Sequence, residues 1–392
     1  MELKLDTSKT YAIALEGGGA KGAYEIGAWM ALDEVGIRYN AVSGTSVGAL
    51  NGALMAMRDL SKAIDVWRNI QLTDVMNLNP EEEADLRKLF AGSAGFSDFH
   101  DLLDQVRDVI RNRGIDVSPL RAWVREVVDP AKVKASDVDL YVCTVSLSDK
   151  KGLEIHVNDL PENEICDMLL ASAYHPSFRL EKLGGKLYTD GGFIDSLPLH
   201  VLVENGYQDI IAIRIPGMGR ERHFRIPDDV QVTYVETFAD LGSALNFDAA
   251  QSRRDMLVGY FDTMRVLYGL TGRNYYVERT IPEREALDWL LDARCLDDIP
   301  LREILEKEFP KLAKRLDAGG SYYDLMLAVL EREAEAAGVP SMRILTDRQL
   351  LAETLVKKGH RITLDETYAE REPMRMVRET LQNIGIKDES NH

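Results

Sequence analysis

The sequence has little cysteine and no long hydrophobic run. Its 392 residues include only three cysteines, Cys143, Cys166 and Cys295, which are widely spaced and form no C-x-x-C pair. This pattern excludes a disulfide framework and a cysteine zinc site, and it is typical of a reducing compartment. No apolar stretch approaches the roughly 20 residues that cross a bilayer, and the N-terminus has no signal-peptide pattern. We therefore expect a soluble, cytoplasmic protein.

Positive charge is also scarce. The chain has 47 Lys and Arg against 65 Asp and Glu, which gives a formal net charge of −18. Nucleic-acid phosphates need a basic footprint, so a nucleic-acid partner is excluded. Constitutive adhesion to an anionic membrane is disfavoured as well, although transient contact with a membrane surface through a local basic patch stays open. The sequence contains neither an H-E-x-x-H motif nor an EF-hand loop, so we expect no metal and no cofactor.

The order of strand-like and helix-like segments indicates an α/β fold. The apolar run Tyr11–Leu15 predicts a buried strand, and a helix follows from about 23 to 35. A second strand ending at Gly44 leads into another helix. This alternation predicts a mainly parallel sheet with helices on its faces. Later strand-like runs lie at 140–145, 153–157 and 209–215, with a helix at 162–172.

Two regions follow from this pattern. Residues 8–215 form the α/β domain, with a helical insertion at about 61–128 in which apolar residues recur at helix-face spacing. Residues 216–392 contain one more strand-like run at 230–235 and then mostly amphipathic helices punctuated by prolines. We expect a mainly helical C-terminal region, whose role the sequence does not define. The sequence does not define the oligomeric state of the protein either.

Residues 44–48 read Gly-Thr-Ser-Val-Gly at the point where the second strand turns into a helix. In a G-x-S-x-G elbow the serine occupies a strained strand-to-helix turn, and the glycines let the chain bend without a Cβ clash. Ser46 is therefore the candidate nucleophile, with Gly44 and Gly48 forming the elbow.

A glycine-rich loop follows the first strand and has two interpretations. Backbone amides from such a loop can stabilise the oxyanion of acyl transfer, because no side chain blocks their approach. The competing interpretation is dinucleotide binding, which needs an acidic residue at the end of the second strand. The second strand ends in Ser43-Gly44 and has no such acidic residue. A phosphate-binding P-loop is disfavoured as well, because no Gly-Lys-Ser/Thr sequence follows the glycines. An oxyanion hole is therefore the favoured interpretation. Its residues are Gly17, Gly18, Gly19, Lys21 and Gly22.

Asp190 precedes two glycines, Gly191 and Gly192. An aspartate in this position forms a plain turn in many proteins, but a serine nucleophile needs a base, and a carboxylate held against the hydroxyl can serve. In α/β-hydrolase order a histidine base should follow the acid. The histidines that do so lie in no glycine-marked loop, and a structural or surface role fits each better: His200, His223 and His360.

These blocks, in this order, resemble the signatures of the patatin-like phospholipases. Two further stretches strengthen the resemblance, one from Leu170 to Phe178 and one from Leu187 to Pro198. The resemblance covers about half of the chain, from residue 8 to residue 215. It implies a three-layer α/β/α fold and a Ser46–Asp190 dyad without a catalytic histidine. The Gly17–Gly19 amides would match the oxyanion hole, and Lys21 would match a loop-positioning basic residue.

The chain departs from the family pattern at two positions. Ser196 replaces a common asparagine, and His175 occupies a usually apolar position before Pro176. Neither removes a catalytic element, so these departures put substrate choice in doubt. The resemblance implies a lipid acyl hydrolase that cleaves fatty-acyl esters through an acyl-enzyme. The alternatives are a transacylase using the same serine and a non-catalytic lipid-binding or regulatory protein.

Two features bear on the substrate, a lipid or another acyl ester. The helical block at 86–128 either lines an apolar slot for an acyl chain or acts as a lid over it, or it simply completes the core. A cationic run either meets lipid headgroups or is a solvated loop, and the second interpretation is favoured. It consists of Arg214, Arg220, Arg222, His223 and Arg225.

Overall fold

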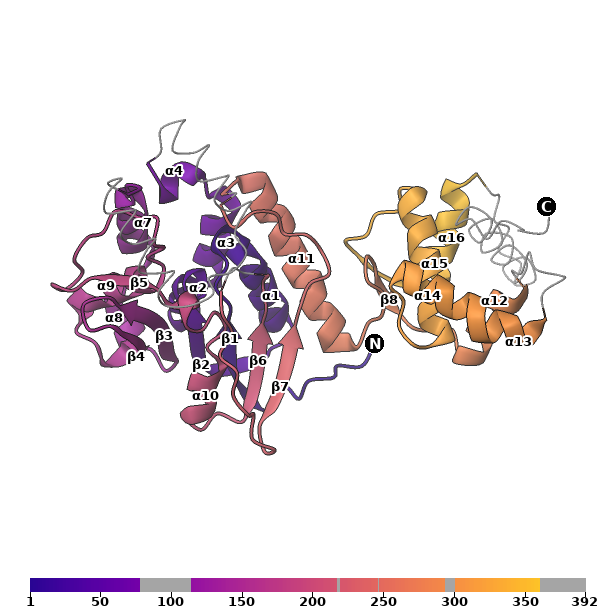
Figure 1. Ribbon diagram of the computed structural model, residues 1–392, viewed down its shortest axis with the longest axis horizontal. Helices are drawn as coiled ribbons and strands as arrows, with labels where there is room; N and C mark the ends of the chain where they lie inside the picture. Colours follow the sequence, from indigo (N-terminus) through magenta and orange to yellow (C-terminus); the bar gives the residue numbers. More distant parts are fainter. Residues whose placement is uncertain (78–113, 217–218, 246, 293–299, 360–392) are drawn as a thin grey trace. The chain divides into compact units, whose positions relative to one another are not determined.

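The computed structural model describes residues 1–77, 114–216, 219–245, 247–292 and 300–359. The chain divides into two compact units (Figure 1). The sheet unit comprises residues 5–266, and the helical unit comprises residues 1–4 together with those after 266.

A seven-stranded, mainly parallel sheet forms the centre of the sheet unit. Its strands run in the order β4-β3-β2-β1-β6-β7, and β5 pairs with β3 outside this path. Neighbours on the path are parallel except β3 and β4, and β5 is antiparallel to β3. The mainly parallel sheet predicted from the sequence is confirmed. The strands are β1 (Thr10–Leu15), β2 (Arg38–Thr45), β3 (Asp139–Ser146), β4 (Lys151–His156), β5 (Tyr188–Asp190), β6 (Asp209–Ile213) and β7 (Gln231–Val235).

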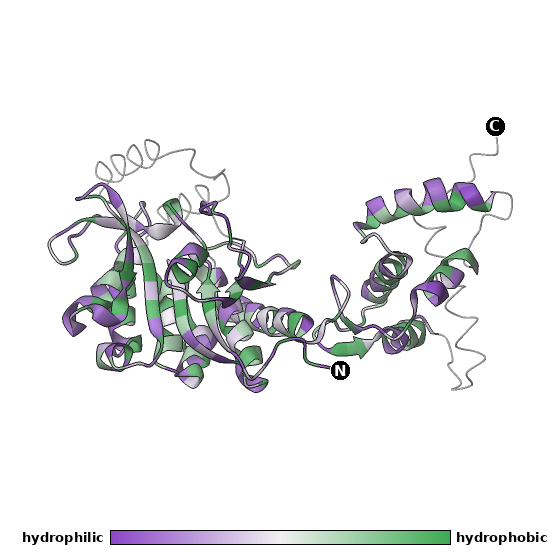
Figure 2. Cartoon of the chain, turned by 90° about the horizontal axis from the view of Figure 1, so that it is seen from below, coloured by the Kyte–Doolittle hydropathy of each residue, from purple (hydrophilic) through white to green (hydrophobic). Residues whose placement is uncertain are grey.

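Helices cover both faces of this sheet, which gives the expected three layers. Alternate residues of a strand point to opposite faces. Ala12 and Ala14 pack with α10 residues on one face, whereas Leu15 and Val42 lie beneath α2 on the other. Figure 2 shows hydrophobic residues concentrated in the sheet strands. The helices are η1 (Gly19–Gly22), α1 (Ala23–Glu34), α2 (Val47–Ala56), α3 (Leu60–Asn69), α4 (Leu72–Val75), α7 (Ser118–Val127), α8 (Pro130–Lys134), η2 (Val157–Asp159), α9 (Glu162–Ser172), η3 (Gly191–Phe193), α10 (Leu199–Glu204) and α11 (Ala249–Tyr268).

The helical insertion expected at about 61–128 is described in part. Its described residues contain most of α3, together with α4 and α7. Residues 78–113 lie outside the described residues, and with them most of the apolar pattern between Phe99 and Ile110.

The domain boundary expected at residue 215 falls inside the sheet unit. β7 extends the sheet beyond β6, and α11 packs against α1 through two glycines. A Cβ on Gly27 would lie 1.8 Å from a backbone oxygen of α11, and a Cβ on Gly259 would lie 2.0 Å from one of α1. Because these backbones touch, residues 216–266 belong to the same compact unit as the strands.

The helical unit has a core of its own, built around side chains such as Trp289, Tyr323 and Leu330. Buried carboxylates organise its loops. Glu331, for example, accepts the amides of residues 273–275 at 2.7–3.0 Å. The expected helical C-terminal region is confirmed. Its elements are β8 (Tyr276–Glu278), α12 (Glu283–Asp292), α13 (Leu301–Glu303), a π-helix (Ile304–Glu308), α14 (Phe309–Leu316), α15 (Tyr322–Ala336), β9 (Ile344–Thr346) and α16 (Asp347–Lys357).

No helix within the described ranges has the length and apolar character needed to cross a membrane.

Candidate active site

Ser46 lies on a sharp turn between β2 and α2. Its backbone has φ 56° and ψ −122°, a left-handed conformation that is strained for a residue with a Cβ. The neighbouring glycines allow this turn. A Cβ on Gly44 would lie 2.2 Å from the Gly48 carbonyl oxygen, and one on Gly48 would lie 2.7 Å from that of Leu15. Residues 44–48 therefore form a sharp strand-to-helix turn, which we call the elbow.

β3 brings Asp190 next to this elbow. The last residue of β2, Thr45, pairs with Cys143 of β3. Asp190, the last residue of β5, pairs with the next residue of β3, Thr144. β2 and β5 thus meet end to end along one edge of β3, and Ser46 and Asp190 lie where they meet.

Asp190 is buried, with 8% of its surface exposed. Its carboxylate accepts a hydrogen bond from the Gly192 amide at 2.8 Å. Burial raises the pKa of Asp190 to about 6, while hydrogen bonds from the Ser46 hydroxyl and the Gly192 amide lower it. Gly191 is required by packing, because a Cβ there would lie 2.2 Å from the Cys143 carbonyl oxygen. The carboxylate therefore faces Ser46 with a pKa suited to accepting a proton near neutrality.

Ser172, at the end of α9, is hydrogen-bonded to the backbone of the elbow. Its hydroxyl accepts a hydrogen bond from the Ser46 amide at 3.0 Å and donates one to the Cys143 carbonyl at 2.6 Å. The side chain is fully buried. It thus fixes the strained backbone of Ser46 to β3. In the sequence, Ser172 was marked only as part of the stretch from Leu170 to Phe178 that strengthens the family resemblance, and nothing there indicated its contact with Ser46.

The glycine loop lies directly beside the elbow. A Cβ on Gly17 would lie 3.2 Å from the Ser46 Cβ. The Gly17 amide, however, donates to the Ser196 carbonyl at 2.9 Å, so it is already engaged. Within the described residues, the amides of Gly18 and Gly19 have no acceptor. The expected set of Gly17–Gly19 donors is therefore reduced to these two.

Lys21 and Gly22 lie at the far end of the loop. The Lys21 ammonium donates to the Pro216 carbonyl at 2.5 Å, which ties the loop to the segment after β6. Burial lowers the pKa of Lys21, and the carboxylates of Asp240 and Asp255 raise it. Gly22 is in close contact with α2, because a Cβ there would lie 2.5 Å from a methyl carbon of Val47.

Two adjoining pockets meet at Ser46. The larger one is apolar and is lined by residues of α2, α3 and α7, including Leu50, Trp67 and Trp123. The smaller one is lined largely by the glycine loop and by the segment after Asp190. Trp67 and its neighbours in α3 were not singled out from the sequence, although the amphipathic pattern of that helix marks an apolar face.

The histidines occupy different environments. His175 lines both pockets, and burial lowers its pKa to about 4, so its imidazole is neutral. His200 lies between Asp195 and Glu154 and lines neither pocket. His223 is exposed on a loop, and His360 lies outside the described residues.

Two arginines of the cationic run after β6 pair with carboxylates. Arg214 contacts Glu16, Glu221 and Glu236. Arg222 pairs with Glu154 at 3.0 Å. These contacts favour the interpretation of a solvated, internally paired loop. Among the described residues, no cluster of three or more His, Cys, Asp or Glu side chains is arranged to hold a metal ion.

Known proteins are similar in sequence to about half of this chain. Residues 13–203 match a family described as patatin-like phospholipase. Neuropathy target esterase sws of Drosophila melanogaster is 28% identical over 220 residues, which cover 53% of this chain and 13% of the relative. Lysophospholipase NTE1 of Cryptococcus neoformans is 26% identical over 211 residues, which cover 52% of this chain and 11% of the relative. The crystal structure of VipD from Legionella pneumophila is 13% identical, with a TM-score of 0.37, covering 98% of this chain and 89% of that one.

The parallel sheet and its elbow define an α/β protein that presents a serine at the carboxyl edge of the sheet. Residues 13–203 of this chain belong to the patatin-like phospholipase family. The chain spans only a small part of the length of its curated relatives.

Proposed function

We propose that the sheet unit is a lipid acyl hydrolase that cleaves fatty-acyl esters through an acyl-enzyme on Ser46. The observation that carries this proposal is the placement of Ser46. It sits on a strained elbow, with the buried Asp190 carboxylate beside its hydroxyl and an apolar pocket at its side. Family membership supports the same chemistry, and the names of the relatives, an esterase and a lysophospholipase, agree with it.

In the proposed acylation, Asp190 accepts the proton of the Ser46 hydroxyl while the serine oxygen attacks the ester carbonyl carbon. The amides of Gly18 and Gly19 donate to the oxyanion of the tetrahedral intermediate. The intermediate collapses, the bond to the leaving alcohol breaks, and Asp190 returns the proton to that alcohol.

Deacylation repeats these steps with water. Asp190 accepts a proton from the water molecule, whose oxygen attacks the acyl carbon. The second intermediate releases the fatty acid, and the proton passes back to the Ser46 oxygen. This cycle uses no metal and no cofactor.

A release assay tests the proposal. We expect the full chain to liberate free fatty acid from at least one member of a panel of phospholipids, lysophospholipids and short-chain esters, as measured by mass spectrometry. Absence of release from every ester would contradict hydrolysis. Transfer of the acyl group to an added alcohol, without free fatty acid, would favour a transacylase.

The apolar pocket predicts a dependence on acyl-chain length. Trp123 of α7 lines this pocket and is only half-buried, so its loss should cost little stability. In Trp123→Ala, KM for a long-chain ester is expected to rise about 10-fold, because lost apolar contact is worth on the order of 1–2 kcal/mol. KM for an acetyl ester should stay within about twofold, since such a short chain does not reach the pocket wall.

The matched control for this prediction is Glu126→Ala, an exposed position on the same helix. Steady-state kinetics with esters of two to sixteen carbons would measure both variants. Equal changes in KM for every chain length in Trp123→Ala would show that the acyl chain does not occupy this pocket.

A further inference from the structure

A short segment after Asp190 holds the strand that carries the nucleophile. We name Asp195–Pro198 the linking segment. Its Asp195 carbonyl accepts a hydrogen bond from the Thr45 hydroxyl at 2.9 Å, and its Pro198 carbonyl accepts one from the Ser43 hydroxyl at 2.9 Å. Both donors are buried. The end of β2 before the elbow is therefore hydrogen-bonded to the linking segment at two positions on one face of the strand.

The linking segment also holds the glycine loop. Its Ser196 carbonyl accepts the Gly17 amide at 2.9 Å, and the Ser196 amide donates to the Arg220 carbonyl at 2.6 Å. The loop and the elbow thus share one support. Because a shift of this support would change the distance from Ser46 to the oxyanion donors, its position matters for the proposed reaction.

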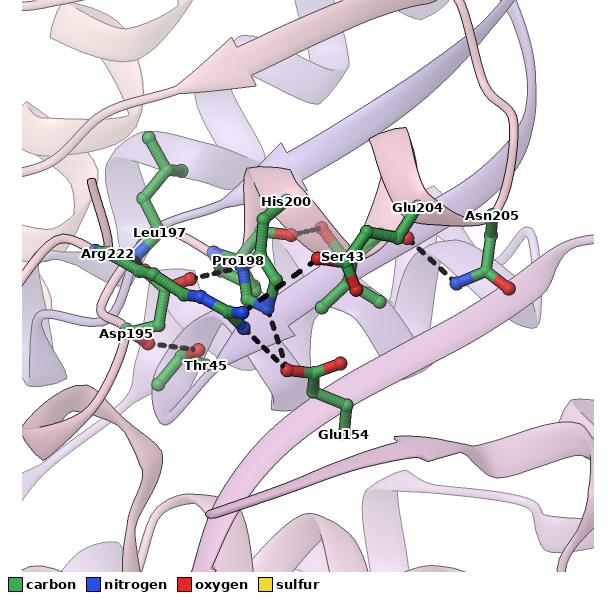
Figure 3. A network of polar contacts seen from close by, with 11 residues as sticks. Ser43, Thr45, Glu154, Asp195, Leu197, Pro198, His200, Glu204, Asn205 and Arg222 are labelled. Atoms are coloured by element: carbon green, nitrogen blue, oxygen red, sulfur yellow. Dashed lines mark hydrogen bonds and ion pairs between the residues drawn. The ribbon is translucent and has the colours of Figure 1, made fainter. Parts of the chain in front are cut away.

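The linking segment is in turn held by a buried contact between a carboxylate and an imidazole (Figure 3). The Asp195 carboxylate lies 2.6 Å from Nδ1 of His200, and the two side chains are 2% and 1% exposed. The same carboxylate accepts the amides of Leu197 and Arg222 at 3.3 Å. The Asp195 carboxylate therefore orders its own segment through three contacts, two with backbone amides and one with the His200 side chain.

His200 has a carboxylate on each side. Its Nε2 lies 2.8 Å from Glu154 of β4, which also pairs with Arg222 at 3.0 Å (Figure 3). Burial lowers the pKa of His200, but hydrogen bonds and charge interactions with Asp195 and Glu154 outweigh this effect, so its pKa is raised. Its Nδ1 therefore faces Asp195 and its Nε2 faces Glu154, so the imidazole lies between two carboxylates. Removal of the Nδ1 group would leave the buried Asp195 carboxylate without this partner, which is destabilising.

We propose that His200 is a positioning residue for hydrolysis at Ser46: through Asp195 it fixes the linking segment, which aligns the elbow with the glycine loop. This inference rests on the proposed function. His200 lines neither pocket at Ser46, so it acts through Asp195 and not on the substrate.

Two amide variants separate the two sides of the imidazole. An asparagine at position 200 places its amide nitrogen where Nδ1 lies, and a glutamine places its own near Nε2. His200→Asn therefore keeps a donor to Asp195 and loses the contact with Glu154. His200→Gln keeps a donor to Glu154 and loses the contact with Asp195. We expect His200→Gln to lower kcat by about 10- to 100-fold with little change in KM, and His200→Asn to lower it by less than about threefold.

The readouts are kcat per reactive serine and the rate constant for phosphonylation of Ser46 by a fluorophosphonate. Counting reactive serines removes any loss of folded protein, so a purely structural role would leave both quantities unchanged. Glu154→Gln serves as a further control and should behave like His200→Asn. Should His200→Gln fail to fold, Thr45→Val, which deletes the hydroxyl donor to Asp195 at nearly constant volume, is expected to lower kcat by about 10-fold.

Three outcomes would overturn the inference. Equal rates per reactive serine in His200→Gln and wild type would show that the linking segment does not depend on the pair. Complete loss of phosphonylation in both amide variants would make His200 the base and remove the Asp190 assignment. An unreactive Ser46 in the wild-type chain would overturn the proposed function, and this inference with it.

Discussion

Replacing Ser46 with alanine is expected to lower kcat/KM for ester hydrolysis by on the order of 10⁴-fold or more, because the enzyme loses the oxygen that attacks the ester and no acyl-enzyme forms. Labelling by a fluorophosphonate should disappear at the same time. The substitution leaves the fold intact, since alanine meets the same left-handed backbone strain at φ 56° that serine does. Fatty-acid release, active-site labelling and thermal unfolding would be measured side by side.

Ser252→Ala provides the matched control for this experiment. Ser252 is a buried serine of α11, and its hydroxyl has no hydrogen-bond partner among the described residues. Its loss should leave both labelling and hydrolysis at the wild-type level. Continued labelling of Ser46→Ala at the wild-type rate would mean that another residue is the nucleophile.

Asp190→Asn is expected to lower kcat by on the order of 10³-fold or more, because the amide cannot accept the Ser46 proton. In the wild-type protein the base works only as a carboxylate. Because burial raises the pKa of Asp190 to about 6, kcat/KM for an uncharged ester should rise with pH through about 6 and then level off. The variant should lack this rise.

A pH profile from 4.5 to 9, of the two proteins on one uncharged substrate, measures this difference. A wild-type profile that is flat through pH 6, or an Asp190→Asn variant with normal kcat, would remove Asp190 as the base. His200→Asn offers the comparison, since it changes a histidine near the site without touching the dyad.

The same carboxylate is expected to lower stability. A pKa raised from 3.8 to about 6 in the folded state means that folding disfavours the charged form. This penalty is absent below about pH 3.8 and complete above about pH 6. Asp190→Asn should therefore be more stable than wild type at pH 8, by at most about 3 kcal/mol. Denaturant unfolding at pH 8 and pH 4 measures the gain, which should vanish at the lower pH.

The fold was largely predictable because its signals are local. Apolar runs such as Tyr11–Leu15 mark buried parallel strands, and the glycines at 44 and 48 mark a turn that no other residue allows. The short strand β5 was not predicted, since three residues carry no periodicity. Its position depends on pairing with β3, some 45 residues earlier in the chain. Sequence alone therefore suggested Asp190 as a partner of Ser46 without showing what places it there.

The supporting contacts of the candidate site were beyond sequence reasoning for a related reason. Nothing near Gly17 indicates that its amide is taken by the Ser196 carbonyl. His200 reads as an ordinary residue at a helix start, and only the folded chain brings Asp195 and Glu154 to its two nitrogens. Such contacts join residues far apart in sequence, so no local pattern records them. The roles of Ser46, Asp190 and the glycine-loop amides remain predictions.

The close packing of α1 on α11 at Gly27 and Gly259 limits where this chain can be divided and joined to other sequence. The helix that starts at the glycine loop shares its backbone contact with α11, well beyond the last residue of the family match at 203. A gene fusion or exchange that joined foreign sequence directly after residue 203 would separate α1 from the helix that fits its glycine. The smallest piece that keeps the elbow together with this helix packing therefore extends through α11, well past the end of the family match.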